Sequence, residues 1–430
     1  MKLTISLQIV KARHLEGAAQ IYIQLNVQEI CQKYMPAPNS RSKKTASKNV
    51  TVQAAARIDL FGGWLDTPPI TLHAKPSAVV NMAITIDGKK PIICHIRPSF
   101  TSGVTVRTDG TTILLPNASA VLASYNKPGN PGALICACLV CIGVPKKRED
   151  DLSSILEERF SSKGLEIECL SILPHGSGLG TSSILAAAII KGLWESSGIP
   201  YTEKNICHAV RINSQLPRLY MGANGGATTD DRRWVARSSW MPLSRRKERF
   251  LRMQIFQGYI CEDDGSVDVE GISISQEFEQ EINKRMVLIY TGKTRLAKNL
   301  LQEVIRGWYS GGPICEVIRS LEENVSKFVE ALKRGRIDHD LVEVYYRAKK
   351  SLASGCEPET IASLISSLKS KDLIETAWLA GAGGGGFLYV WLKPNASVKE
   401  IRIHVKTFGS AGMTVHTVEV DHFPMIVSLI

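Results

Sequence analysis

The sequence has 430 residues, 44% of them hydrophobic, which is enough for two domains with cores of their own. Its longest apolar run, residues 133–144, is too short to cross a bilayer, and the first residues lack the layout of a signal peptide. The net charge of +11 would suit nucleic acid, but residues 211–252 alone supply +7 of it. We therefore expect neither a nucleic-acid nor a membrane partner.

Ten cysteines are scattered along the chain, and Cys136, Cys138 and Cys141 fall inside the apolar run. No second cysteine pair or histidine pair lies nearby to complete a metal site. We therefore expect small buried thiols in a reducing compartment, and a cytoplasmic protein.

Residues 5–35 mix apolar and polar positions in a way that predicts one or two helices. Residues 36–49 are rich in turn formers and charge, which is typical of a linker. We expect a domain to begin near Val50. Residues 1–49 would then be the helical tail of an upstream region plus a linker, and the chain would be a piece of a longer protein.

Residues 52–73 predict a short strand, a Gly-Gly turn, Asp66 and a Pro-Pro pair that stops regular pairing. Arg57 could neutralise phosphate oxygens and Asp66 could hold hydroxyl groups. Alternatively, Asp66 caps the local backbone. Residues 78–92 continue as a strand, a turn at Asp87 and Gly88, and a second strand.

The next elements suggest mixed α and β structure up to residue 210. We predict strands at 104–106, 112–115 and 164–173, a buried helix at 133–142, and a helix from Thr202, its N-cap.

Residues 174–183, PHGSGLGTSS, form a glycine loop that opens directly into an apolar helix. Glycine lets a backbone approach a ligand closely, and a helix N-terminus offers free N–H groups and partial positive charge. The spacing is not that of a P-loop, and Thr181 replaces the third glycine of a dinucleotide fingerprint. The loop therefore either holds an anion such as phosphate or simply caps a core helix.

The C-terminal half predicts a buried strand, a turn and an amphipathic helix over residues 286–309, then helices at 313–334, 338–353 and 358–368. Lys293 and Arg295 either face a cleft or lie in a solvated turn. Residues 377–392 place a glycine run between two strands, and residues 415–420 supply a final strand.

Three of these stretches, in this order, resemble the GHMP small-molecule kinases. The glycine loop is similar to their ATP-phosphate loop, PxGxGLG[ST]S. Residues 52–73 resemble their first motif, with GGWxDTPP most similar to L-fucokinases, and the glycine run resembles their third motif. The resemblance implies an α+β, two-domain fold, with a mixed β/α N-terminal domain over residues 50–250 and an α/β sandwich over residues 251–430.

The resemblance also implies roles for individual residues. Arg57 would be catalytic, and Gly63 and Asp66 would bind the sugar. Ser182 would contact Mg²⁺. ATP would be bound by Pro174, Gly176, Ser177, Gly178, Leu179, Gly180, Thr181, Ser182, Ser183, Gly383, Gly384 and Gly385.

Residues 211–250 break the pattern, because they show no helical or strand period and carry a dense basic run. A disordered basic loop is one interpretation. In fucokinases this place should hold EQLLTTGGGWQDQVGG, whose Glu binds Mg²⁺ and whose Asp serves the sugar hydroxyl. Back-translation of residues 231–241, read one base later, gives TGGGWQDQVG. We interpret the residues just after Val210 as retained intron or the product of a misplaced splice boundary, and the following ones as coding sequence read out of frame. Both acids are then missing from the polypeptide, and Asp230 and Asp231 are the only acids close by.

The resemblance therefore implies an ATP- and Mg²⁺-dependent sugar kinase that phosphorylates the anomeric hydroxyl of L-fucose, inactive as written. Two alternatives stay open: an inactive nucleotide- or sugar-binding pseudokinase, or a heptose-phosphate kinase.

Overall fold

The structure is a computed structural model. It describes residues 48–430 apart from 66, 68–69, 71–72, 74–77, 126, 128, 175, 220–252, 261–266, 294–297, 410, 424 and 430, together with scattered positions between 10 and 36. At 211–212, 214–219, 253–260, 267–269, 298–299 and 301 it describes the backbone alone. The positions described between Val10 and Gln32 are helical, as predicted.

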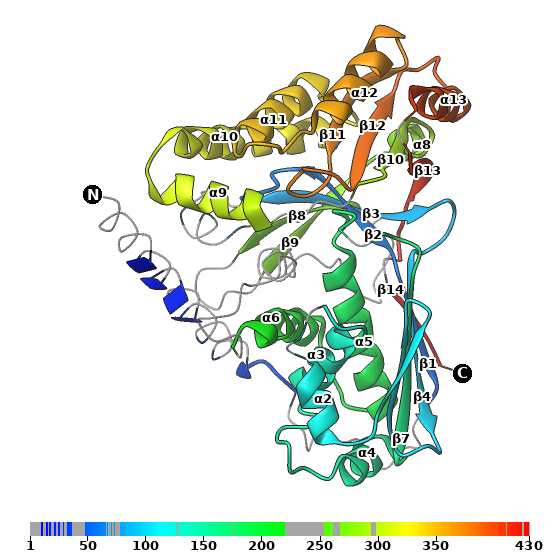
Figure 1. The fold of residues 1–430 in the computed structure, drawn as a ribbon. Helices are drawn as coiled ribbons and strands as arrows, with labels where there is room; N and C mark the ends of the chain where they lie inside the picture. The colour runs from blue at the N-terminus through cyan, green and yellow to red at the C-terminus, as the bar shows by residue number, and fades with distance from the viewer. Residues whose placement is uncertain are drawn as a thin grey trace.

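The first of two sheets has six strands in the order β14-β1-β4-β7-β5-β6. All neighbours are antiparallel except the parallel pair β5 and β7. The strands are β1 (Val50–Ala54), β4 (Ile92–Ser99), β5 (Gly103–Thr108), β6 (Thr111–Leu115), β7 (Gly164–Ser171) and β14 (Met425–Leu429). One face is covered by α2 (Ala118–Ser124), α3 (Ala133–Cys141), α4 (Leu152–Phe160), α5 (Thr181–Ser197) and α6 (Glu203–Leu219) (Figure 1).

The second sheet has eight strands, in the order β11-β12-β10-β13-β3-β8-β9 with β2 paired to β3. They are β2 (Ala56–Phe61), β3 (Val79–Ile86), β8 (Met253–Ile260), β9 (Val267–Ser273), β10 (Met286–Thr291), β11 (Ile374–Leu379), β12 (Phe387–Leu392) and β13 (Met413–Val420). The helices that pack around it are α8 (Gln276–Arg285), α9 (Lys298–Tyr309), α10 (Pro313–Lys333), α11 (His339–Ser351), α12 (Glu359–Ser370) and α13 (Val398–Phe408).

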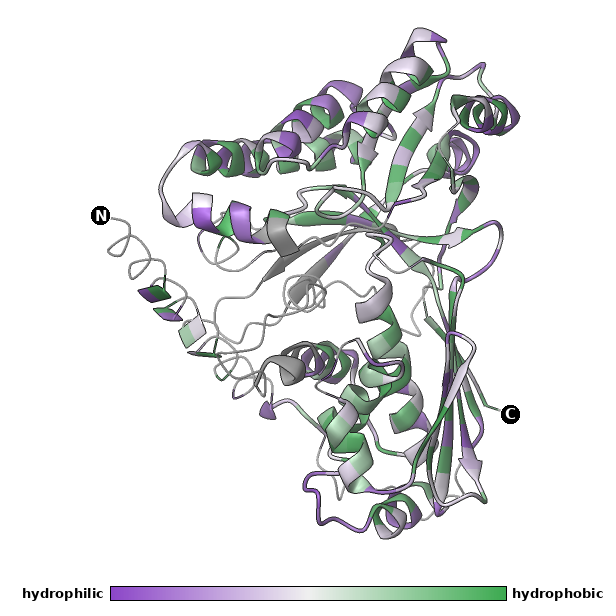
Figure 2. Cartoon of the chain, viewed as in Figure 1, coloured by the Kyte–Doolittle hydropathy of each residue, from purple (hydrophilic) through white to green (hydrophobic). Residues whose placement is uncertain are grey.

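Each sheet has its own hydrophobic core, and the apolar faces of the helices turn toward the sheets (Figure 2). The first core contains Cys94, Cys136, Cys138 and Cys169, which confirms the predicted burial of Cys136 and Cys138, whereas Cys141 is only half-buried. Burial raises the pKa of the Cys136 thiol to about 12, so this thiol stays protonated at neutral pH. None of the helices in the described ranges is long and apolar enough to span a membrane.

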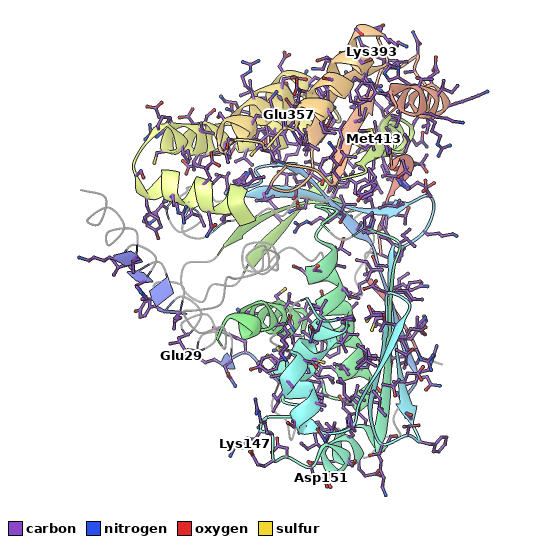
Figure 3. All side chains as sticks on the ribbon, viewed as in Figure 1. Glu29, Lys147, Asp151, Glu357, Lys393 and Met413 are labelled. Atoms are coloured by element: carbon purple, nitrogen blue, oxygen red, sulfur yellow. The ribbon has the colours of Figure 1, made fainter. Side chains whose placement is uncertain are left out.

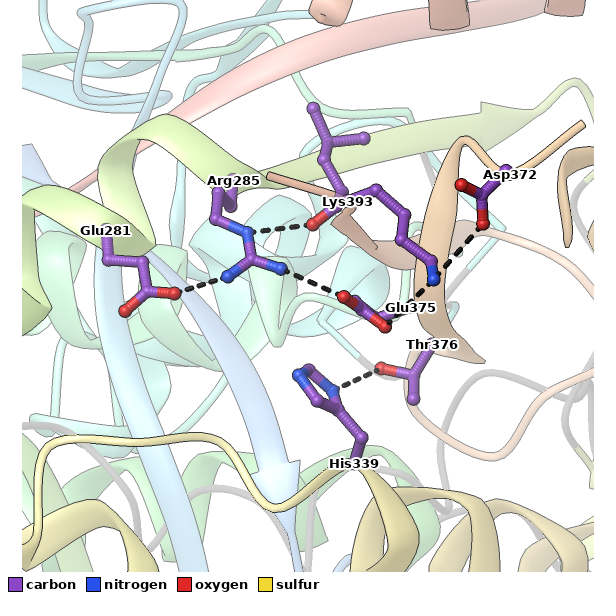
Figure 4. Close-up of polar contacts among 8 residues, drawn as sticks. Glu281, Arg285, His339, Asp372, Glu375, Thr376 and Lys393 are labelled. Atoms are coloured by element: carbon purple, nitrogen blue, oxygen red, sulfur yellow. Dashed lines mark hydrogen bonds and ion pairs between the residues drawn. The ribbon is translucent and has the colours of Figure 1, made fainter. Parts of the chain in front are cut away.

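Polar contacts fix the ends of several elements. Asp151, labelled in Figure 3, caps α4 by accepting from the N–H groups of Ser153 and Ser154. Arg285, at the end of α8, donates from Nε to the carbonyl of Leu392 at 2.8 Å and contacts Glu375 at 3.5 Å (Figure 4). The Arg285 contacts hold α8 against the β11–β12 pair, whose two strands lead into and out of the glycine run.

Two sequence predictions need correction. Residues 211–219 are helical, since α6 continues to Leu219, although we found no helical period there. The strand at 415–420 is not the last, because β14 follows it and pairs with β1. The first sheet therefore pairs β1 with β14, two strands far apart in the sequence, whereas β2 and β3, which follow β1, belong to the second sheet.

Candidate functional site

The glycine loop, residues 174–183, joins β7 to α5. Gly176, Gly178 and Gly180 have positive φ values of 69°, 83° and 74°, which other residues rarely adopt. In the described part of the chain no side chain caps α5, whose N-cap is Gly180. The first N–H groups of this helix are therefore left for an external acceptor, which suits an anion.

Hydrogen bonds within the loop, and burial of some of its side chains, fix its conformation. The hydroxyls of Ser177 and Thr181 are hydrogen-bonded at 2.8 Å, and the Ser177 N–H donates to the Pro174 carbonyl at 3.2 Å. Leu179 is fully buried in the core of the second sheet, and Ser183 is also buried. Ser182, in the first turn of α5, is only half-buried. The loop thus offers backbone N–H groups and the Ser182 hydroxyl.

Arg57 of β2 lies directly against this loop. A Cβ atom built on Gly180 would stand 3.6 Å from the carbon and two nitrogens of the guanidinium. Arg57 is 4% exposed, and its Nε lies 3.0 Å from Oδ1 of Asp59. The cation predicted to neutralise phosphate is therefore next to the predicted anion site.

The glycine run between β11 and β12, residues 381–386, forms a hairpin that packs on the same loop. The N–H of Phe387 donates to the Ser177 carbonyl at 3.0 Å. A Cβ on Gly178 would lie 2.8 Å from Cβ of Ala380, and one on Gly386 would lie 2.6 Å from the Ser177 carbonyl oxygen. The predicted packing of the hairpin beside the loop is therefore confirmed, and its role toward a nucleotide stays a prediction.

Gly383, Gly384 and Gly385 lie inside this hairpin, all with positive φ. The Gly384 N–H donates to the Cys356 carbonyl at 2.7 Å, so this part of the hairpin packs on the segment between α11 and α12. The carbonyl of Lys293 accepts from the Gly386 N–H at 2.9 Å, and the Lys293 side chain is exposed. Arg295 lies outside the described residues.

The turn after β2 holds the predicted sugar-binding residues. Gly63 lies against α11, since a Cβ there would be 2.8 Å from Oη of Tyr345. Asp66 lies outside the described residues, as do Asp230 and Asp231 and most of the segment predicted to be out of frame. The structure therefore brings together Arg57, the glycine loop and the hairpin, and places Gly63 at the end of the strand that carries Arg57.

Sequence reasoning missed three buried polar residues near this site: Asp59, Asn81 and Lys349. Asn81 of β3 is the residue opposite Asp59 in the β2–β3 ladder. Lys349 of α11 is 2% exposed and donates to the Leu379 carbonyl at 2.6 Å, at the start of the hairpin. The only signal of Asp59 and Asn81 in the sequence was a polar residue inside an apolar strand, and Lys349 gave no signal among the other charges of its helix.

Comparison with known proteins shows which families the chain is similar to. The family model described as GHMP kinases N terminal domain matches residues 151–230. The bifunctional fucokinase/GDP-fucose pyrophosphorylase of Arabidopsis thaliana is 28% identical over 83% of the chain and 31% of the relative. The L-fucokinase/L-fucose-1-P guanylyltransferase of Bacteroides fragilis is 27% identical over 81% of the chain and 35% of the relative. The chain spans about a third of the length of these curated relatives.

Solved structures share the fold. A D-glycero-D-manno-heptose 1-phosphate kinase from Bacteroides thetaiotaomicron superposes with a TM-score of 0.56 at 17% identity, over 89% of this chain and 99% of that one. The mixed, two-domain architecture predicted from the sequence is confirmed. The chain is therefore similar to the GHMP kinases: residues 151–230 match their N-terminal domain, and the two curated relatives that it matches over most of its length are fucokinases.

Proposed function

We propose that this chain is the kinase portion of a fucokinase-type protein, in which the γ-phosphate of ATP passes to the anomeric hydroxyl of L-fucose. The observation that carries the proposal is the meeting of Arg57, the uncapped start of α5 and the glycine hairpin at one place. The similarity to two fucokinases supports L-fucose as the acceptor.

The residues present fit the phosphates of a nucleotide. The N–H groups at the start of α5 supply donors and partial positive charge, and Arg57 adds a full charge beside Gly180. Glycine in the loop and the hairpin keeps side chains out of the space between them. Such a site promotes phosphoryl transfer by positioning the reactants and neutralising charge, which is most of what this reaction needs.

The residues that the structure describes do not by themselves make a complete Mg²⁺ site. Among the residues that the structure describes, no group of three His, Cys, Asp or Glu side chains could hold a metal ion. Ser182 offers a single hydroxyl, whereas Mg²⁺ in kinases is bound by carboxylates together with phosphate oxygens. The metal-binding Glu and catalytic Asp of the family are replaced in the 211–250 segment. We therefore infer that the polypeptide as written binds nucleotide without turnover.

The test compares two polypeptides: the chain as written, and one in which residues 211–250 are replaced by the family segment predicted from the shifted frame. Nucleotide affinity is measured by calorimetry with a non-hydrolysable ATP analogue, and turnover by release of ADP. We expect both polypeptides to bind nucleotide and only the second to phosphorylate L-fucose. Sequencing the transcript across codons 205–257 shows which of the two the gene encodes.

Each alternative gives a different result. If neither polypeptide binds nucleotide, the glycine loop only caps a core helix and the proposal is wrong. If the chain as written turns over, the printed segment supplies the missing acids. If the second polypeptide prefers a heptose phosphate in a panel of sugars, the reaction class holds and the substrate is wrong.

A further inference from the structure

A polar row crosses one face of β2 and β3. In the ladder Arg57 pairs with Ala83 and Asp59 pairs with Asn81, so the side chains of these four residues lie on the same face. Residues on the other face, among them Ile58 and Leu60, pack in the core of the second sheet. Because the Arg57 guanidinium adjoins Gly180, the polar face is the one that looks toward the start of α5.

Asn81 is the unexplained member of this row. It is 4% exposed, and within the described part of the chain neither its Oδ1 nor its Nδ2 has a hydrogen-bond partner. An amide can make up to four hydrogen bonds, and folded proteins rarely bury one that makes none. Arg57 and Asp59, by contrast, form an ion pair with each other.

The turn that follows β2 holds a second group of this kind. Trp64 has a φ of 92°, an uncommon value for a residue other than glycine, and its buried indole N–H also lacks a partner in the described ranges. Strained backbone and unsatisfied buried groups concentrate at ligand sites. Asn81 of β3 lies opposite Asp59, which stands between Arg57 and this turn along β2. Asn81 is therefore between the predicted phosphate end and the predicted sugar end of the site.

We propose that Asn81 binds the sugar acceptor through hydrogen bonds to two neighbouring hydroxyls, one of them the hydroxyl next to the anomeric carbon. The proposal rests on the proposed function and names a specificity residue for it. A neutral amide both donates and accepts, which matches a pair of hydroxyls, whereas Oδ1 would repel a phosphate oxygen. Since both amide atoms are buried, the sugar reaches them only after this face opens locally.

The test is the substitution Asn81→Leu, which keeps the size of the side chain and removes both polar atoms. Affinity for L-fucose is measured by calorimetry on the full chain with the ATP analogue bound, and thermal unfolding is measured without ligands. We expect the L-fucose affinity to fall at least tenfold and the nucleotide affinity to stay within twofold. We also expect the midpoint of unfolding not to fall, because no hydrogen bond of the free protein is lost.

Asn213→Leu is the matched control. Asn213 is also a buried asparagine, at 2% exposure, but its Nδ2 donates to Sγ of Cys138 at 3.3 Å, in the first core. This control should lower the midpoint of unfolding and leave the L-fucose affinity unchanged. A further arm uses L-fucose lacking the hydroxyl next to the anomeric carbon: the native chain should bind it more weakly than L-fucose, and Asn81→Leu should bind the two alike.

One result would overturn the inference alone: native L-fucose affinity in Asn81→Leu. A fall in the unfolding midpoint of that variant at the same time would mean that an ordered water is the only partner of the amide. If the native chain binds nucleotide but no sugar, both the inference and the choice of acceptor are wrong. If the native chain binds no nucleotide, the proposed function itself fails.

Discussion

Gly178 is one of the points at which the glycine loop touches the hairpin, so Gly178→Ala tests whether that contact shapes the nucleotide site. The new methyl group meets two obstacles. First, position 178 has a backbone φ of 83°, which costs an alanine about 1–2 kcal/mol. Its Cβ would lie 2.8 Å from Cβ of Ala380, well inside the ordinary carbon–carbon contact of about 3.5–4.0 Å. Overpacking of this kind costs about 1–3 kcal/mol more.

Gly88→Ala is the control that separates backbone strain at a positive φ from steric displacement of the loop. Gly88 has a φ of 72° and nothing within 4 Å of the position a Cβ would take, in the turn between β3 and β4. It should therefore show the backbone strain alone, about 1–2 kcal/mol. Because Gly178→Ala must also move the loop away from Ala380, we expect it to weaken nucleotide binding at least tenfold, or about 1.4 kcal/mol, while Gly88→Ala leaves the affinity unchanged.

The assays are chemical or thermal unfolding of both variants and calorimetric titration with the ATP analogue. If Gly178→Ala binds the analogue as the native chain does, while losing more stability than Gly88→Ala, the contact supports the fold only. If the two variants lose the same stability, the loop shifts without cost and the steric argument is wrong.

Two further predictions concern buried and charged groups. Lys349→Met should lower the midpoint of unfolding, because it removes the Lys349 hydrogen bond to the Leu379 carbonyl, a cost of about 1–3 kcal/mol. It should also weaken nucleotide binding, because Leu379 begins the hairpin. Unchanged affinity for the ATP analogue would contradict this. Partial burial opposes ionisation of Asp87, but hydrogen bonds from His416 and Thr417 outweigh it and hold its pKa below the ordinary value. Asp87→Asn should therefore destabilise the protein at neutral pH, and the difference in unfolding midpoint should begin to shrink below about pH 4 and keep shrinking as the pH falls through the lowered pKa of the native carboxyl; a difference that stays constant from neutral pH down to the lowest pH at which the protein is folded would refute it.

Local signals in the sequence were sufficient for many elements. The Asp87-Gly88 pair predicts a tight turn between strands, and both residues have positive φ in the turn that joins β3 and β4. Thr202 caps α6 as predicted, accepting from the N–H of Asn205 at 3.3 Å. Each of these features is decided by residues a few positions apart, which is why the sequence reveals them.

Features set by distant contacts were not visible. Residues 425–429 carry no clear alternation, and they form β14 because the edge of β1 offers them a partner. The helix α6 continues past Val210 although the stretch contains Pro217 and several polar or basic residues. Within that stretch, the buried side-chain amide of Asn213 donates a hydrogen bond to Cys138 of α3. Packing of α6 against α3 therefore outweighs the weak helical pattern of the local sequence.

The candidate site divides in the same way. The glycine loop and the hairpin each have a distinctive composition, and the resemblance to a family supplied their pairing. Asn81 sits inside the apolar run of β3, and Lys349 sits on an amphipathic helix with other charges. The register of β2 against β3 shows that Asn81 lies near Arg57. The hydrogen bond from Lys349 of α11 to Leu379 of β11 shows that Lys349 lies beside the hairpin.

The pairing of β14 with β1 bears on how the protein is made. Val50 pairs with Leu429, so a ribosome must translate as far as Leu429 before the six-stranded sheet gains the strand beside β1. Until then β1 presents an open edge, and such edges invite pairing with other chains. Non-local pairing also slows folding. We therefore expect chains cut before Met425 during expression to aggregate, even though every residue discussed at the candidate site would be present in them.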